Sequence, residues 1–330
     1  MGRLRKKWKA VTRTAGYGLA VAARAALAAL PAGARLRSGE VLGSLAWRLA
    51  WRERRRALAH LEQAFGPDRP AAELRRIGRE CFRNLGRCVA EVCALRRARA
   101  EDVLEFFDEE SAGAVARCAE LAAAGPGVVA VTAHLDNWEL SAAYASARGM
   151  PLSVVARHLY FEPYDRMVNE MRRRFGAEVI YQDESPRKML RALRAGRVLA
   201  LLADQDVSRL DGVFVPFFGR PAYTPTGPVA LAVASGAPVV LMYGLRTGRD
   251  RHRLVLEGPL EFDRAEKHRA ALEGTRLWSA RLEAVIRERP EQWVWMHRRW
   301  RTRPEDRPEA ARRSGCPVAA DQAAAAGEPA

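Results

Sequence analysis

A histidine and a glutamate near residue 130 have the types and spacing of a proton-transfer site. The apolar, β-branched run Val128–Thr132 is followed at once by His134, and Glu139 stands five residues later in an amphipathic segment. A histidine whose ring is held by a carboxylate can take a proton from an alcohol at neutral pH. We therefore predict that His134 is a general base oriented by Glu139, an arrangement suited to acyl transfer to a hydroxyl.

The spacing restricts how the two side chains can meet. Five positions correspond to about 500° around an ideal helix, so both cannot lie on one helix face. We expect His134 on the loop at a strand end and Glu139 in the first turn of the next helix, whose N-terminus favours a neutral imidazole and offers N–H groups to an oxyanion. A buried structural histidine is the plainest alternative. A metal site of His134, Asp136 and Glu139 is another, although no further His or Cys cluster with ligand spacing accompanies it. No G-x-S-x-G elbow supports a serine nucleophile.

The pattern around this pair predicts an α/β fold with a mixed, mainly parallel central sheet flanked by helices. From residue 127 onward, short apolar runs alternate with helical patterns, which is typical of such sheets. The expected strands are 128–132, 152–156, 179–181, 198–203, 239–244 and 254–256. The expected helices between and after them are 140–148, 163–175, 185–195, 225–234 and 265–288.

The rest of the chain divides into three parts. Residues 1–35 carry a basic run and then an alanine-rich apolar stretch interrupted by Arg24, which we interpret as a membrane-associating segment rather than a spanning helix or a signal peptide. An ordinary amphipathic helix docked on the domain fits this stretch equally well. Residues 36–305 form the main domain, helical to about 125 and α/β after it. Residues 306–330, rich in alanine, proline and arginine without apolar periodicity, are expected to be a disordered tail.

Composition limits the partners. The 330-residue chain has a net charge of +16, a pI near 10.4 and a mean hydropathy of −0.25, which indicates a globular protein with a strongly basic surface. Such a surface attracts nucleic acid, anionic lipid or an acidic protein, and charge alone does not choose among them. The five cysteines form no C-x-x-C pair and are expected to be buried thiols in a reducing compartment.

A second polar cluster follows the expected strand 198–203. Asp204, Gln205 and Asp206 stand at its carboxyl end, where α/β proteins gather their sites, and we expect them to bind or shape a substrate site. A turn-forming acidic cluster is the alternative. The segment 216–219 could line an apolar groove or pack as an ordinary loop.

These blocks resemble the late acyltransferases of lipid A biosynthesis, the lauroyl/myristoyl transferase family within the lysophospholipid acyltransferase superfamily. The resemblance covers roughly residues 15–305 and begins with the H-x4-[DE] box, present here as His134-Leu-Asp-Asn-Trp-Glu139. Further blocks follow in the family's order at 151–157, 202–206, 213–219, 226–228 and 291–304. The ordered set is much more specific than a single box.

The resemblance implies that His134 deprotonates an acceptor hydroxyl, which attacks an acyl thioester carried by acyl carrier protein or acyl-CoA. It implies no covalent enzyme intermediate, no cofactor and no metal. Arg157 would bind an acceptor phosphate, with a solvated surface arginine as the alternative. Asp136 and Asn137, inside the box, are expected to contact the acceptor; adjustment of the basicity of His134 is the alternative role for Asp136. Many family members have glycine where this chain has Asp136, which weakens any transfer of acceptor specificity.

The resemblance also implies a setting for the reaction. The acceptor would be a lipid A precursor or a related anionic glycolipid, at the cytoplasmic face of the inner membrane. Within 297–299, His297 and its two arginines are a candidate phosphate clamp or an interior ion pair that ties the C-terminus down. Acylation of another lysophospholipid is one alternative, an inactive homologue serving as a membrane scaffold is another, and a basic nucleic-acid-binding protein is a third from a different class. No nucleic-acid-binding motif supports the last, so we expect no nucleic acid partner.

Overall fold

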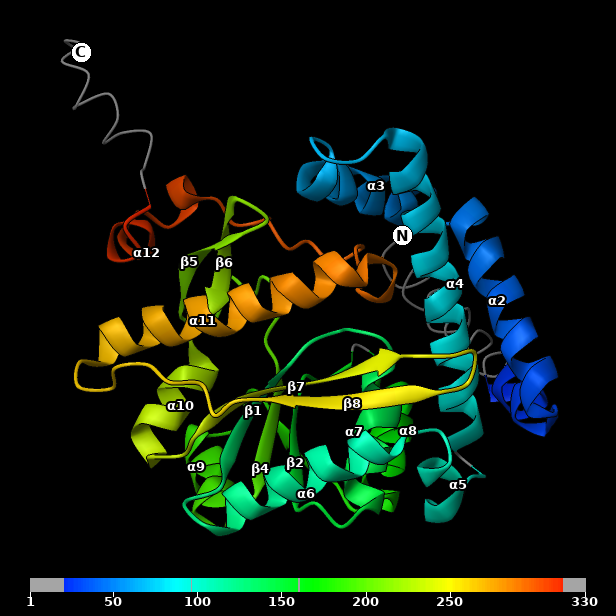
Figure 1. The fold of residues 1–330 in the computed structure, drawn as a ribbon, viewed down its shortest axis with the longest axis horizontal. Helices are drawn as coiled ribbons and strands as arrows, with labels where there is room; N and C mark the ends of the chain where they lie inside the picture. The colour runs from blue at the N-terminus through cyan, green and yellow to red at the C-terminus, as the bar shows by residue number, and fades with distance from the viewer. Residues whose placement is uncertain (1–20, 96, 160, 317–330) are drawn as a thin grey trace, which may run out of the picture.

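A central six-stranded sheet organises the chain in the computed structural model, which describes residues 21–95, 97–159 and 161–316 (Figure 1). The strand order is β3-β2-β4-β1-β7-β8, parallel except for β8. The strands are β1 (Val128–Thr132), β2 (Leu152–Ala156), β3 (Glu178–Tyr181), β4 (Val198–Leu202), β7 (Val239–Arg246) and β8 (His252–Glu257). The predicted mainly parallel sheet is thus confirmed.

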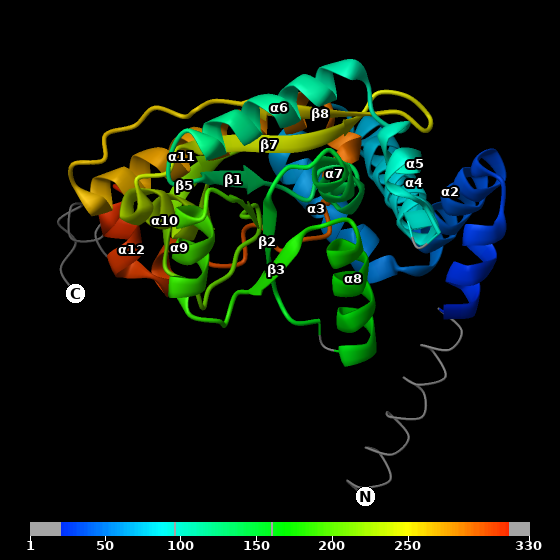
Figure 2. The same ribbon diagram turned by 90° about the horizontal axis from the view of Figure 1, so that it is seen from below.

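Helices cover both faces of this sheet (Figures 1 and 2). On one face lie α6 (Glu109–Ala123), α7 (Trp138–Ala147) and α8 (Glu162–Arg174), and on the other lie α9 (Pro186–Arg194), α10 (Gly227–Ser235) and α11 (Lys267–Glu288). Successive strand residues point to opposite faces, so Val129 and Val131 join one apolar core whereas Val128 and Ala130 join the other. Burial on both faces explains why these strands read as continuous apolar runs.

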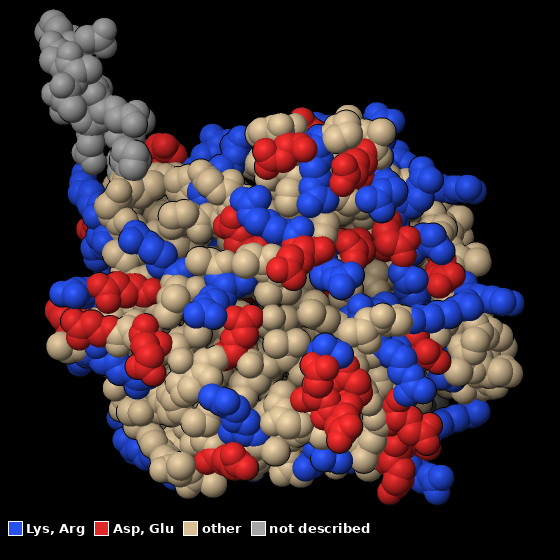
Figure 3. Space-filling model, in the orientation of Figure 1, with Lys and Arg blue, Asp and Glu red and all other residues tan. Residues whose placement is uncertain are grey.

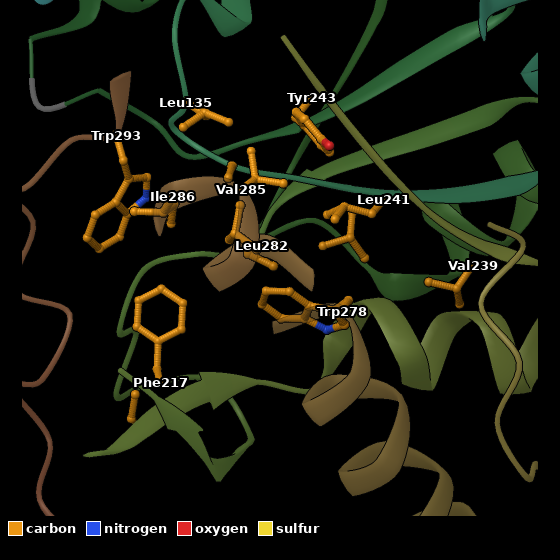
Figure 4. Close-up of a cluster of buried hydrophobic side chains, with 14 of the residues drawn as sticks. Leu135, Phe217, Val239, Leu241, Tyr243, Trp278, Leu282, Val285, Ile286 and Trp293 are labelled. Carbon is orange, nitrogen blue, oxygen red and sulfur yellow. The ribbon is translucent and has the colours of Figure 1, made fainter. Parts of the chain in front are cut away.

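The larger core lies between the sheet and α11. Its members include Leu241 from β7 and Trp278 and Leu282 from α11 (Figure 4). Phe217, from a strand before α11, and Trp293, from the segment after α11, also belong to it (Figure 4). Trp278 and Trp293 are both fully buried. Indole rings bury large apolar areas, so this core holds α11 and the segment after it firmly against the sheet.

The first part of the described chain is helical. Residues 21–29 are helical, and α2 (Ala32–Leu49), α3 (Trp51–Phe65), α4 (Ala71–Leu95) and the short α5 (Ala100–Leu104) follow. Helices α2 and α4 lie side by side at one end of the molecule (Figures 1 and 2). A Cβ on Gly39 or Gly86 would collide with the backbone carbonyl of the opposite helix, so glycine allows this close approach.

Two features differ from the sequence prediction. Residues 212–225 form an antiparallel hairpin of β5 (Gly212–Phe217) and β6 (Arg220–Pro225), packed on α11. The expected disordered tail from 306 begins instead with α12 (Pro308–Arg313), whose Ala310 and Ala311 are buried against β5. Short 3₁₀ turns, η1 (Pro290–Gln292) and η2 (Pro304–Asp306), precede it. Alanine in a short helix gives no apolar period that sequence reasoning can detect.

Two earlier expectations fall partly outside the described chain. Residues 1–20 of the expected membrane-associating segment lie there, as do residues 317–330 of the expected tail. Within the described residues, no helix combines the length and apolarity needed to cross a bilayer.

Candidate active site

The sheet brings His134 and Asp204 together. Strands β1 and β4 are parallel neighbours, with Thr132 paired to Leu202, and the amide of Ala203 donates a hydrogen bond to the carbonyl of Thr132. His134 and Asp204 each follow the last residue of their strand by two positions. Because carboxyl ends of parallel strands meet at one edge of a sheet, the two side chains share the site there.

The Asp204 carboxylate holds the imidazole of His134. Nδ1 of His134 lies 2.7 Å from Oδ1 of Asp204, while Oδ2 accepts hydrogen bonds from the backbone N–H of His134 and from Nε1 of Trp293, both at 2.9 Å. Asp204 is fully buried, which by itself would raise its pKa, but the charge and hydrogen bonds of His134 outweigh burial and keep the pKa of Asp204 below its usual range. An ionised Asp204 at Nδ1 makes that nitrogen the donor, which leaves Nε2 as the acceptor.

A second histidine faces the first across Gln205. The side-chain nitrogen of Gln205 lies 3.2 Å from Nε2 of His134 and 3.1 Å from Nε2 of His297, and the two imidazole centroids are 4.6 Å apart. Burial, reinforced by His134, lowers the pKa of His297 to about 4, so it is neutral at pH 7. The side-chain amide of Gln205 therefore lies between the Nε2 atoms of the two imidazoles. The donor atoms of His134, Asp204 and His297 lie within 4.8 Å of one another, a grouping that has the composition of a small metal site.

Glu139 is paired with a different residue from the one we expected. It lies in the first turn of α7, as predicted, but its carboxylate accepts from Nη2 and Nε of Arg172 on α8, at 2.5 and 3.0 Å. The carboxylate at Nδ1 of His134 is that of Asp204. Residue types and spacing alone did not distinguish the two acids, because Asp204 is 70 residues from His134 and reaches it only through strand pairing.

Two other residues of the H-x4-[DE] box are buried within the protein. Asp136, 1% exposed, contacts Nδ1 of His252 at 2.5 Å and Nε of Arg246 at 3.3 Å. Asn137, 2% exposed, caps α7 by accepting from the amide of Leu140 and donates to Glu91. Both were expected to contact the acceptor, whereas in the structure their polar groups are bonded to the interior behind the loop.

The other site residues predicted from the sequence have three different environments in the structure. Arg157 follows β2 and is exposed. Asp206 accepts from the amide and hydroxyl of Thr302, so it ties the C-terminal segment to the loop after β4. Arg299, from the candidate phosphate clamp, is fully buried and donates to the carbonyl of Tyr223 and the hydroxyl of Thr224. It therefore ties the C-terminal segment to β6 in the interior, but through a carbonyl and a hydroxyl rather than through the ion pair that was expected.

Two apolar spaces border the His134–Asp204 pair, which we call the dyad. One is a cavity of about 60 Å³ between α7 and the sheet, with Trp138, Glu139 and Arg172 among its lining residues and small side chains such as Ala142 along α7. The ring of Trp138 contacts the ring of His134, with centroids 4.8 Å apart, so this cavity adjoins the dyad. The other is a groove of about 400 Å³ along α9 and α10, bordered by Ala203.

Sequence reasoning missed two members of the site. The hydrogen bond from Trp293 to Asp204 and the pairing of Arg172 with Glu139 join segments that are 89 and 33 residues apart in the chain. No spacing rule predicts such pairs. A tryptophan-rich segment after a long helix was visible at 293–300, and only its packing against β1 and β4 explains its place in the site.

A histidine held by a buried acid at the strand ends of a mainly parallel sheet, beside an apolar cavity, is an arrangement suited to deprotonating a hydroxyl that accepts a group from an apolar carrier. The sequence profile of the bacterial lipid A biosynthesis acyltransferase family matches residues 5–302, so the chain belongs to that family. The resemblance inferred from the motifs is thereby confirmed, and so, at the level of the family, is the enzyme class, an acyltransferase.

Individual relatives agree with this assignment. The lipid A biosynthesis myristoyltransferase of Escherichia coli is 26% identical over 291 residues, which cover 87% of each chain. The phosphatidylinositol mannoside acyltransferase of Mycobacterium tuberculosis is 34% identical over 122 residues, covering 36% of this chain and only 38% of that relative. The lauroyltransferase of Escherichia coli is 35% identical over 126 residues, covering 36% of this chain and 39% of that relative.

Proposed function

We propose that this protein transfers a fatty acyl group from an acyl thioester to a hydroxyl of a lipid A precursor or a related glycolipid. The observation that carries the proposal is the His134–Asp204 contact of 2.7 Å, with Nε2 of His134 left as a proton acceptor beside an apolar cavity. The names of the full-length relatives support lipid A as the acceptor, and the mannoside acyltransferase keeps a different glycolipid as the second candidate.

The reaction follows from this geometry. Nε2 of His134 removes the acceptor's hydroxyl proton while the oxygen attacks the thioester carbonyl carbon, and Asp204 stabilises the imidazolium that forms. The tetrahedral intermediate then collapses: the C–S bond breaks, the C–O ester bond remains, and the imidazolium returns its proton to the departing sulfur. Gln205, whose amide nitrogen lies 3.2 Å from Nε2, is well placed to bind the oxygen of the acceptor or the developing oxyanion.

Glu139 acts in this proposal through Arg172 rather than through the imidazole. Both residues of this ion pair line the α7 cavity, as does Trp138. We place the donor's acyl chain in that cavity, since Trp138 connects it to His134 and most of its lining is apolar. The small side chains of Ala142 and Ala145 border this cavity of about 60 Å³, which holds only part of a fatty acyl chain, so a full chain requires displacement of α7.

The outer surface of α2 and the start of α3 supply a membrane contact. Large apolar side chains there are unusually exposed: Leu49 at 69%, Val41 at 66% and Trp51 at 54%. Arg48 precedes Leu49 and Arg52 follows Trp51, and basic side chains are spread over the surface around these helices (Figure 3). Exposed apolar groups with cationic neighbours favour an anionic bilayer surface, here the cytoplasmic face of the inner membrane. The same basic surface suits an acidic donor such as acyl carrier protein.

One assay tests the central claim. Purified wild type, His134→Ala and, as a control, His268→Ala at the exposed start of α11 are compared for transfer of labelled acyl groups to a lipid A precursor, a phosphatidylinositol mannoside and a lysophospholipid. We expect activity on the first or second acceptor that is lost in His134→Ala and retained in His268→Ala. Equal activity in all three proteins would remove His134 from catalysis. Salt-sensitive DNA binding without any acyl transfer would favour the nucleic-acid alternative.

A further inference from the structure

Four charged side chains are buried together behind the loop that carries His134. Glu91 comes from α4, Asp136 from the loop after β1, Arg246 from the end of β7 and His252 from the start of β8. Their exposed fractions are 2%, 1%, 9% and 0%. Such a cluster is costly to bury unless its charges are paired and its hydrogen bonds are made.

The pairing is nearly complete. Glu91 accepts from both terminal nitrogens of Arg246, at 2.6 and 2.8 Å, and lies 3.3 Å from Nε2 of His252. Asp136 contacts Nδ1 of the same imidazole at 2.5 Å and Nε of Arg246 at 3.3 Å. Both nitrogens of His252 therefore face a carboxylate, which requires a donor at each. Two anions and two cations make the cluster neutral only when His252 carries its proton.

The surroundings of His252 offer no other source of charge balance. Burial lowers the pKa of His252, but Asp136 and Glu91 outweigh it and raise the pKa to about 9. Cys88 on α4 has its pKa raised by burial and stays a neutral thiol. Near the imidazole, the segment before α6 contributes the ring of Phe107. Of its charged residues, Asp108 pairs with Arg253 rather than with the imidazole.

The cluster is connected to the catalytic loop through the backbone of Asp136. Asp136 has φ 45°, a left-handed conformation that is uncommon for residues other than glycine. Its amide donates to the carbonyl of Gln292 at 2.8 Å, and its own carbonyl accepts from Sγ of Cys88 at 3.5 Å. Gln292 in turn exchanges hydrogen bonds with the backbone of Arg246. The loop is thus tied to β7 and α4 two residues after His134.

We propose that Asp136 and a charged His252 form a positioning pair that holds the strained loop between β1 and α7, and through it the imidazole of His134, in its reactive geometry. The inference rests on the proposed function, in which His134 is the base. Asp204 anchors the imidazole from one side, and Asp136 anchors its backbone from the other. Loss of the Asp136 carboxylate should then displace the base while the apolar cavity between α7 and the sheet keeps its lining.

The first experiment separates the carboxylate from the backbone conformation. Glycine adopts φ 45° without strain, so Asp136→Gly removes the anchor and not the fold of the loop. Asp136→Asn, which also tolerates this conformation, is the second variant if the glycine protein is unstable. We expect kcat to fall about 10- to 100-fold, as small misplacements of reacting groups do, with KM for the acyl donor within about two-fold of wild type.

Two further readouts distinguish positioning from general destabilisation. The alkaline limb of the kcat–pH profile, corrected for spontaneous thioester hydrolysis, should move to lower pH in Asp136→Gly, since His252 loses one carboxylate partner. NMR titration of the His252 ring should show the same downward shift of its pKa without any turnover. His252→Gln combined with Asp136→Gly should cost no more kcat than the larger single effect, because the residues act as one unit.

These experiments distinguish failure of the positioning role from failure of the proposed acyl transfer. An Asp136→Gly enzyme with wild-type kcat and an unmoved alkaline limb would overturn the positioning role. So would a His252 ring that titrates near pH 6.5 in the wild-type protein. If wild type transfers no acyl group to any acceptor, the proposed function fails, and the NMR titration still decides whether Asp136 holds His252 in its charged form.

Discussion

Replacement of Asp204 by asparagine should reverse the tautomer of His134. In the native site Oδ2 accepts from two donors, the backbone N–H of His134 and Nε1 of Trp293, both at 2.9 Å. An asparagine must keep its oxygen there, because its NH₂ group cannot accept from either donor. The NH₂ group then faces Nδ1 of His134, which becomes the acceptor, and the proton moves to Nε2. An imidazole with its proton on Nε2 cannot serve as the base.

The magnitude follows from the same geometry. A tautomer reversal in a histidine–aspartate pair costs about 10⁴-fold in kcat, which corresponds to about 5.5 kcal/mol of transition-state stabilisation. We therefore expect Asp204→Asn to reduce kcat by about 10³- to 10⁴-fold with a small change in KM. The assay is steady-state acyl transfer to the preferred acceptor, combined with ¹⁵N shifts of the His134 ring that report which nitrogen is protonated.

Asp206→Asn is the matched control. It belongs to the same three-residue segment, but its carboxylate bonds to Thr302 and not to His134. We expect it to retain activity within about ten-fold of wild type and to keep the native tautomer. An Asp204→Asn enzyme within ten-fold of wild type, or equal losses in both variants, would refute the assignment of Asp204 as the orienting acid.

Three other predictions follow from the structure. Ala142→Leu, which fills the α7 cavity, should shift donor preference toward shorter acyl chains in a chain-length series. Ala230→Leu, in the groove along α10, should leave that preference unchanged. A shift in Ala230→Leu and none in Ala142→Leu would place the acyl chain in the groove along α10 instead. The pKa of His252 is raised to about 9 from 6.5, so its contribution to folding is fully present below pH 6.5 and is lost as pH rises through 9. Urea unfolding should show a loss of about 3 kcal/mol over that range in wild type and a flatter profile in His252→Gln. Leu45→Glu on α2 should weaken sedimentation with anionic vesicles several-fold, whereas Leu159→Glu, equally exposed but outside α2, should not; equal effects would argue against α2 as the membrane contact.

Much of the architecture could be predicted from periodicity. The strands β1, β2 and β4 were predictable because both their faces are buried, which produces apolar runs bounded by polar turns. The hairpin of β5 and β6 escaped prediction. Its residues include Pro216, Pro221 and Pro225, which argue against an ordinary strand, and its stability comes from packing on α11 rather than from alternation.

The residues of the candidate site could be predicted from the sequence, but which acid contacts the His134 imidazole could not. His134 and Asp204 were both singled out as strand-end residues, because parallel strands deliver their carboxyl ends to one edge. Which acid meets the imidazole depends on strand order. Asp204 reaches Nδ1 because β4 lies next to β1, whereas the early turn of α7 directs Glu139 toward Arg172.

The amino-acid sequence by itself determined the fold class, the family and the candidate base His134, because each depends on local residue types and their spacing. The tertiary structure decided the partner of the base, the interior role of Asp136 and the neighbouring His297. The contacts of His134 with Asp204, of Asp136 with His252 and of His134 with His297 join residues 70, 116 and 163 positions apart. Their geometry arises only when the sheet, α4 and the segment after α11 pack together. Short-range patterns carry no information on that packing.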